Sequence, residues 1–560
     1  MRAPLGATAR HSAARPASTA SDSAPGKAWN SVTCAGMKLR SGGKCARRSA
    51  SSHACVAASS IKVRISGSES GSPAAMRASL APPAALARRM GGGEDAAMAL
   101  LLQSLPLVAL LALLGSGRAG PVGACLAALA VAVPAVQASL PPGASLPAFL
   151  AVEALRGAYL ALQPVGVVAG GLLFYAAVAG GERPEARPAT AARVFGVTLP
   201  MGAFLESVTG FAVGAVFALG ALRGMGIGGA AAVALSVQAL VLVPWGGLGP
   251  GTALGAVLAG VPAHDVALAA VWPNAAWLLL LGPVMWSLSG RAGVPVPGRE
   301  RSAQLGMLAA IAALLVLCNL VLPFEVAGVV ATGPVAVRAL WRADPPRDRG
   351  AALGTAAPYL LLTACLLLAR LWTAAPAFRP YADLPGFPLT HVAVVLWLVS
   401  AALLLRLPDG ALRALAALRR AAWPALAMLL YVVFGRVMAG SGGAAALAAA
   451  AAASLGPLAP YAIAPLGLLA GMVTGSNVGS NAALMPVQAA LGWASGLPEA
   501  LAPGVHNFAG GAGAGISAGV LAMLCALVAD GTRPGRVWPL LLPSMALVVL
   551  LGGIAVRVLR

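Results

Sequence analysis

Long apolar runs dominate the chain from about residue 98 to its C-terminus. They occur at about 98–114, 121–140, 158–180, 194–222, 225–245, 250–290, 303–322, 324–340, 353–373, 389–407, 421–440, 443–472, 482–497, 509–529 and 537–556. A helix needs about 20 residues to cross a bilayer, so these runs predict an all-α, polytopic transmembrane bundle with about 12–14 spans. Arg clusters separate the runs, and an even number of crossings fits between neighbouring clusters, in agreement with the positive-inside rule.

One run in the first half contains a polar break around Glu206, which lies deep within the run. A carboxylate at such depth is unfavourable and tends to stay protonated unless it is paired. We therefore predict that Glu206 carries a coupling proton; the alternative is a protonated Glu206 that hydrogen-bonds a neighbouring helix. On a continuous helix its face would be shared by small residues, namely Gly202, Thr209, Gly210 and Val213.

A second polar break interrupts an apolar run in the second half. Six hydroxyl or amide side chains fall there within 15 residues: Thr474, Ser476, Asn477, Ser480, Asn481 and Gln488. Gly475 and Gly479 loosen the helix, and Pro486 interrupts it. Free backbone N–H groups beside hydroxyls at a half-helix N-terminus form a neutral cradle for an anion. The alternative is a turn outside the membrane, but no charged residue occurs from Val437 to Pro498, so we expect the stretch to be buried.

The two breaks correspond to each other, since both carry a Thr-Gly step and each half contains one. Paired interruptions in corresponding positions indicate the midplane substrate site of a transporter. Two further side chains leave alternatives open. His506 either relays protons or lies at the membrane interface, and Arg436 either holds a substrate carboxylate or extends to the interface.

Composition excludes several classes of protein. Of the 560 residues, 59% are hydrophobic and 10% are charged, whereas soluble chains carry about 25% charged residues. A cytosolic enzyme, a secreted disulfide scaffold and a disordered protein are therefore excluded. The single cysteines show no metal-ligand spacing, and we expect neither a metal nor a cofactor.

Charge divides the chain into two regions. Residues 1–90 contribute +12 of the net charge of +21 and contain all four lysines. We interpret 1–90 as a basic low-complexity segment: an organellar transit peptide, a disordered cytoplasmic arm, or a stretch that is not translated, with Met90 or Met98 as the first residue. Residues 98–560 are predicted to form the transmembrane transporter domain. Neither region predicts a basic folded face, so no nucleic acid is expected as a partner.

Four ordered motifs resemble those of the L-lactate permease family. Residues 474–482 and the later Gln488 are similar to that family's Thr-Gly-Ser-Asp-Thr-Ser-Ser-Asn-Ala signature with a downstream Gln. Residues 205–211 resemble its Glu-Gly-Ala-Ala-Gly-Phe-Gly segment, 245–252 its Gly-rich turn, and 507–517 its segment rich in Asn and Gly. The chain departs from the family at Asn477, where the family has Asp, and it lacks the family's Lys near Gly515.

The resemblance implies import of lactate or glycolate together with protons. We expect a proton symporter for a small monocarboxylate, in which Thr209, Gly210, Thr474, Gly475, Ser476, Asn477, Ser480, Asn481 and Gln488 bind substrate and Glu206 and His506 handle the proton. Another organic anion, such as a sulfonate or a dicarboxylate, is the first alternative; a passive channel and an intramembrane enzyme are the others. The expected partners are a small carboxylate, protons and membrane lipid, with a homo-oligomer left open. The expected location is the inner (plasma) membrane.

Overall fold

A computed structural model describes residues 93–141, 143–178 and 188–560, and the predictions for residues 1–90 lie outside this range. The first part of the chain forms α3 (Gly93–Gly115), α4 (Pro121–Ser139), α5 (Leu146–Val178), α6 (Ala191–Thr198), α7 (Pro200–Thr209), α8 (Val213–Gly224), α9 (Gly229–Val237), the 3₁₀ helices η1 (Gln238–Leu240) and η2 (Val243–Leu248), α10 (Pro250–Ala259) and α11 (Ala263–Arg291).

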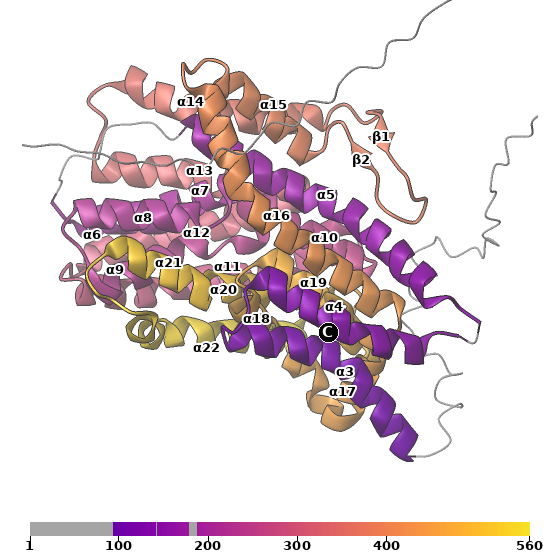
Figure 1. The fold of residues 1–560 in the computed structure, drawn as a ribbon. Coiled ribbons are helices and arrows are strands. Elements are labelled where there is room, and N and C mark those ends of the chain that lie inside the picture. The colour runs from indigo at the N-terminus through magenta and orange to yellow at the C-terminus, as the bar shows by residue number, and fades with distance from the viewer. Residues whose placement is uncertain (1–92, 142, 179–187) are drawn as a thin grey trace, which may run out of the picture. The chain divides into compact units, whose positions relative to one another are not determined.

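The middle of the chain forms α12 (Gly298–Val321), α13 (Phe324–Ala343), α14 (Arg349–Ala369), the antiparallel strands β1 (Ala377–Phe378) and β2 (Phe387–Pro388), and α15 (Val392–Leu404). The last part forms α16 (Gly410–Gly440), α17 (Gly443–Leu455), the 3₁₀ helix η3 (Gly456–Ala462), α18 (Ile463–Thr474), α19 (Asn477–Ala494), α20 (Leu501–Gly515), α21 (Ala518–Val528) and α22 (Pro534–Val558). These helices belong to one compact unit (Figure 1).

The prediction of an all-α, polytopic bundle is confirmed. Within the described ranges, 11 helical segments are long and apolar enough to cross a membrane, and four shorter apolar helices accompany them. The runs at 194–222 and 225–245, which the predicted number of 12–14 spans includes, do not form full-length helices. They fold instead into the short helices α6 to α9, each of which is too short to cross a bilayer alone.

The two halves contain the same elements in the same order. Each has a long helix (α5 or α16), then two interrupted helices (α7/α8 and α9/α10, or α18/α19 and α20/α21), then another long helix (α11 or α22). The long helices α5 and α16 pack along each other and run antiparallel, because Glu153 meets Arg436 near one end while Ala176 meets Arg413 near the other. These two equivalent helices therefore run in opposite directions, as in an inverted repeat.

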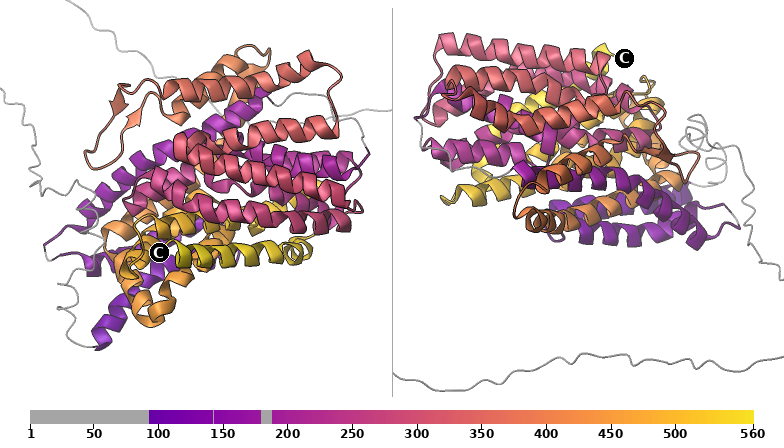
Figure 2. Two further views of the ribbon diagram at one scale, coloured as in Figure 1. Left: turned by 180° about the vertical axis from the view of Figure 1, so that it is seen from behind. Right: turned by 90° about the horizontal axis from the view of Figure 1, so that it is seen from above.

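Elements of the two halves interleave. Helix α21 packs on α8 and α9, and α19 packs on α10 (Figure 1; Figure 2 gives the view from behind and from above). The pair α3–α4 packs beside α16 and α17, whereas α12 and α13 flank α6 and α7. This arrangement brings the interrupted segments of both halves to the interior of the bundle.

Candidate functional site

The first break ends α7 at Thr209 and starts α8 at Val213. Gly210, Phe211 and Ala212 between them all have a positive φ, of 70°, 58° and 59°. Only Gly takes this conformation without strain, so two strained residues hold the break. The expectation that Gly210 and Val213 share a helical face with Glu206 was wrong, because the helix stops before them.

Glu206 lies in the last turn of α7 and is only 4% exposed. Its carboxylate reaches across the break to the start of α8. Oε1 accepts a hydrogen bond from the Ala212 N–H at 3.2 Å, and Oε2 accepts one from the Gly214 N–H at 3.3 Å. An acid at a helix N-terminus satisfies backbone donors that otherwise have no partner and lies at the positive end of the helix dipole.

The second break lies between α18 and α19. Gly475 follows Thr474 with a φ of 68°, and Ser476 caps α19 by accepting a hydrogen bond from the Gly479 N–H. Thr474 donates to the carbonyls of Ala470 and Ser476, which holds the two half-helices together. Thr474 and Asn477 are buried, whereas Gly475 between them is exposed and Ser476 is partly buried, so the flanks of the break lie within the bundle and its turn lines the cavity.

Each half has a second break that packs against the first. In the first half, η1 and η2 separate α9 from α10, and in the second half Ile516 and Ser517 separate α20 from α21. Gly210 and Gly247 touch where the two breaks of the first half meet: a Cβ on Gly210 would lie 3.1 Å from the Gly247 Cα. The sequence analysis noted the Gly-rich bend at 245–252 but did not predict Ser517 as a site residue. Ser517 is a small polar residue, and the residues next to it in the sequence form no motif that marks a binding site.

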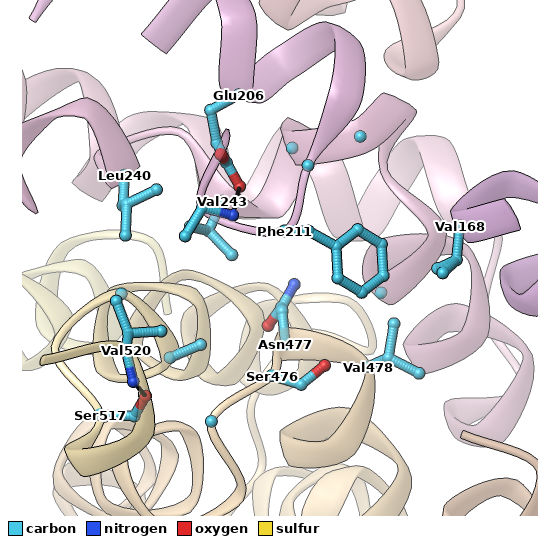
Figure 3. Close-up of a pocket in the computed structure, with 18 of the residues that line it drawn as sticks. Val168, Glu206, Phe211, Leu240, Val243, Ser476, Asn477, Val478, Ser517 and Val520 are labelled. Atoms are coloured by element: carbon cyan, nitrogen blue, oxygen red, sulfur yellow. Dashed lines mark hydrogen bonds between the residues drawn. The ribbon is translucent and has the colours of Figure 1, made fainter. Parts of the chain in front are cut away.

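The breaks of both halves enclose one cavity of about 370 Å³. Its polar lining comes from Glu206, Thr209, Thr474, Ser476, Asn477 and Ser517. Figure 3 shows Glu206, Leu240 and Val243 on one side and Ser476, Asn477, Ser517 and Val520 on the other. Residues predicted from two distant stretches of sequence, including Gly210 and Gly475, therefore line the same space. The volume lies at the lower end of the usual range for ligand pockets, about 300–1,000 Å³.

Four helices begin at the wall of this cavity. They are α8 after Ala212, α10 after Gly249, α19 after Ser476 and α21 after Ser517, and lining residues come from the first turn or the cap of each. A helix N-terminus carries the equivalent of about half a positive charge. No Lys, Arg or His is among the lining residues of the described chain, so positive potential here comes from these N-termini, which alternate with the C-termini of α7, α18 and α20 at the same wall. Such an arrangement suits a small anion.

Four of the predicted site residues lie behind the wall of the cavity. Ser480, Asn481, Gln488 and His506 are at most 1% exposed and do not line it. Asn507 collects hydrogen bonds from the Nδ2 groups of Asn477 (2.9 Å) and Asn481 (3.0 Å) and donates to the Thr252 hydroxyl (2.8 Å). These bonds tie α19, α20 and α10 together, so Asn481 supports the cavity from behind.

His506 is fully buried and hydrogen-bonds Ser480, with Nε2 at 3.3 Å from both the hydroxyl and the backbone carbonyl. It therefore lies within the bundle rather than on its surface. Gln488 donates to the Ile463 carbonyl at the start of α18. Both side chains are separated from the cavity by the first turns of α19 and by α20, so they could act on a substrate only through their neighbours.

Arg436 pairs with an acid on a neighbouring helix. Its guanidinium binds the Glu153 carboxylate through Nε at 2.8 Å and through Nη2 at 2.7 Å, and both side chains are 7% exposed. Arg156 lies 3.9 Å from the same carboxylate. Arg436 thus joins α16 to α5 in a buried ion pair, and it does not line the cavity.

Across the described ranges, no group of three or more His, Cys, Asp or Glu side chains is placed to hold a metal ion. No protein-family model matches this chain, and no curated protein matches it in sequence. One solved structure with partial similarity is the YdaH transporter of Alcanivorax borkumensis, which has an unusual topology. It shares 18% sequence identity at a TM-score of 0.38, over 73% of this chain and 86% of that chain. Because both values are low, the function proposed below rests on the geometry of the cavity.

Proposed function

We propose that this chain is a secondary active transporter that carries a small monocarboxylate across the membrane together with a proton. One observation carries the proposal: the broken helices of two inverted halves meet at a single cavity that four helix N-termini face. Broken helices at the junction of inverted repeats are typical of transporter substrate sites, and half-helix N-termini bind anionic groups there.

The kind of substrate follows from size and charge. A cavity of about 370 Å³ without a lining cation suits an anion with one charge and few atoms. The resemblance to the L-lactate permease family favours lactate or glycolate. Glu206 is the one lining acid among the described residues, and it supplies a place for the proton. Moving one anion with one proton leaves no net charge to cross the lipid. As part of this proposal, the protein acts in the inner (plasma) membrane.

Uptake by the purified full chain in proteoliposomes tests the proposal. Labelled lactate and glycolate should accumulate with saturable kinetics when the outside is more acidic, and a sulfonate and a dicarboxylate should accumulate far less. Protein-free liposomes give the background. Unsaturable uptake that ignores the proton gradient would indicate a channel, and preferred uptake of the sulfonate or dicarboxylate would identify a carrier for another organic anion.

The proton's carrier is tested by Glu206→Gln, which imitates the permanently protonated side chain. Gradient-driven accumulation should be lost, because the proton can no longer be released inside. Exchange of internal for external lactate should persist, since exchange does not need the empty, deprotonated carrier to return. If Glu206→Gln still accumulates lactate against a concentration gradient, a group other than Glu206 carries the coupling proton.

A further inference from the structure

Phe211 is held at the cavity in an unusual backbone conformation. Its φ of 58° lies in the left-handed region, which is strongly disfavoured for a bulky side chain. Gly210 before it adopts a similar φ without strain, and a Gly at position 211 would do the same. Strained residues persist only where the surrounding structure fixes them, and they gather at binding sites. The strain therefore indicates that the ring has a role at the cavity.

The ring of Phe211 is exposed where its apolar neighbours are covered. Phe211 lines the cavity and is 38% exposed, whereas the lining residues Val168, Met428 and Val478 are at most 6% exposed. Figure 3 shows the Phe211 ring at the same end of the cavity as Val168 and Val478, while Leu240 lies at the opposite end. An apolar group placed against this ring would remove its exposed surface from water, which is favourable.

The two halves differ in what they present at corresponding positions. Phe211 follows the Thr-Gly step of the first break, and Ser476 follows the Thr-Gly step of the second, and both line the cavity. In Figure 3, Ser476 and Asn477 lie between the Phe211 end and the Leu240 end. The cavity is therefore polar in its middle and apolar at the Phe211 end, which suits a ligand with a polar head and an apolar side group.

The size of the cavity leaves room for such a side group. Its volume of about 370 Å³ corresponds to roughly twelve water molecules at about 30 Å³ each. A three-carbon acid such as lactate has about half as many non-hydrogen atoms. A longer side chain that extends from the polar middle toward Phe211 would therefore fit without displacing any part of the wall.

We propose that Phe211, together with Val168, Met428 and Val478, forms a subsite for the apolar side chain of the substrate. The substrate is then a monocarboxylate with a short alkyl side chain, and acids with an ethyl or isobutyl group bind more tightly than an acid without one. This inference rests on the function proposed above and deepens it, because it names the substrate class and the residue that selects it.

Four 2-hydroxy acids with the same polar head test the subsite: glycolate, lactate, 2-hydroxybutyrate and 2-hydroxy-4-methylpentanoate. Their inhibition constants are measured against exchange of labelled lactate in proteoliposomes that contain the full chain, at equal pH on both sides. In the wild type, the inhibition constant should fall about fourfold for each added carbon, which is the effect of burying one CH₂ group. Protein-free liposomes give the background.

Substitution of Phe211 should flatten this series. In Phe211→Ala, the ratio of the inhibition constants of glycolate and 2-hydroxybutyrate should fall at least about fourfold, the effect of one CH₂ group, while the constant for glycolate changes little. Phe211→Leu keeps part of the apolar surface and should give an intermediate ratio. Phe211→Gly removes the ring and the strain together, so it supplies the same measurement if Phe211→Ala does not fold.

Phe217→Ala is the matched control, because Phe217 lies on α8, is 37% exposed and is not a lining residue. It should keep the wild-type ratio. A wild type whose inhibition constants do not fall with chain length, an unchanged ratio in the folded Phe211 variants, or an equal loss in Phe217→Ala would overturn the inference while leaving a working lactate transporter. If the wild type exchanges lactate no faster than protein-free liposomes and accumulates no small acid, the proposed function fails as well.

Discussion

At the scale of single residues, Asn477 joins the wall of the cavity to α20. It lines the cavity, and its Nδ2 donates to the Asn507 Oδ1 at 2.9 Å. Asn507 keeps a second donor, Asn481, when Asn477 is removed. Asn477 can therefore be truncated while the Asn507 Oδ1 keeps a hydrogen bond from Asn481. A change in transport can then be attributed to position 477.

We expect Asn477→Ala to raise the KM for lactate by about 5- to 150-fold, because the wall of the cavity loses the hydrogen bond between Asn477 and Asn507, worth about 1–3 kcal/mol. Uptake of labelled lactate into proteoliposomes measures this. Ser480→Ala, behind the wall, should raise the KM less. A wild-type KM in Asn477→Ala would show that Asn477 does not shape the substrate site.

At the scale of helices, the buried pair Glu153–Arg436 joins α5 to α16. Removing Glu153 leaves the buried Arg436 charge without its partner, which typically destabilises a protein by about 3–5 kcal/mol. Removing Arg436 is less unfavourable, because Arg156 lies 3.9 Å from the Glu153 carboxylate. We expect Glu153→Gln to lower the midpoint of thermal unfolding in detergent strongly and Arg436→Met to lower it less. The double variant should be more stable than Glu153→Gln, since it leaves no buried charge without a partner. Additive losses would mean that the two side chains are not coupled.

The loop between α21 and α22 is tied to α9 by Asp530, which accepts a hydrogen bond from the Gly229 N–H at 2.6 Å. Hydrogen bonds from the Thr532 side chain and then from Gly229 hold the pKa of Asp530 below its ordinary value of 3.8. A lowered pKa in the folded state means that the charged form stabilises the fold. This stabilisation is present above about pH 4 and is lost as the pH falls through the folded-state pKa.

We therefore expect Asp530→Asn to lower the unfolding midpoint by a constant amount between about pH 5 and 7, and this difference should shrink below about pH 4. Thermal unfolding of both proteins at each pH checks the expectation. A difference that persists unchanged at the lowest pH would show that the side chain, rather than its charge, fastens the loop.

At the scale of the whole molecule, all lining residues of the cavity lie between Val168 and Met523, within the two inverted halves. A chain that starts at Met98 keeps both halves and nearly all of the first predicted span, Ala97–Gly115. We expect it to fold and to accumulate substrate as the full chain does. A chain that starts at Met90 retains all of α3 and serves as its control. A folded Met98 chain without transport would show that residues 1–97 contribute to the activity.

The sequence by itself determined the class of the fold and the places where the helices break. Apolar content and run length leave helices as the way to satisfy the backbone in lipid, and the Thr-Gly steps at 209–210 and 474–475 mark real helix ends. These properties depend on residues close together in the chain, so a local pattern is enough to predict them. The position of each crossing is not determined in this way, because half-length helices and full crossings have the same local hydropathy.

Only the tertiary structure decided which of these residues face one cavity. Asn477 and Ser480 stand one turn apart in the same polar stretch, yet one lines the cavity and the other lies behind it. The partner of Arg436 is Glu153, which lies 283 residues away in the chain. No local sequence pattern predicts such a pair. Likewise, Glu206 reaches Ala212 and Gly214 only because strained residues turn the chain back. Contacts of this kind arise from how distant helices pack, and spacing along the chain does not encode them.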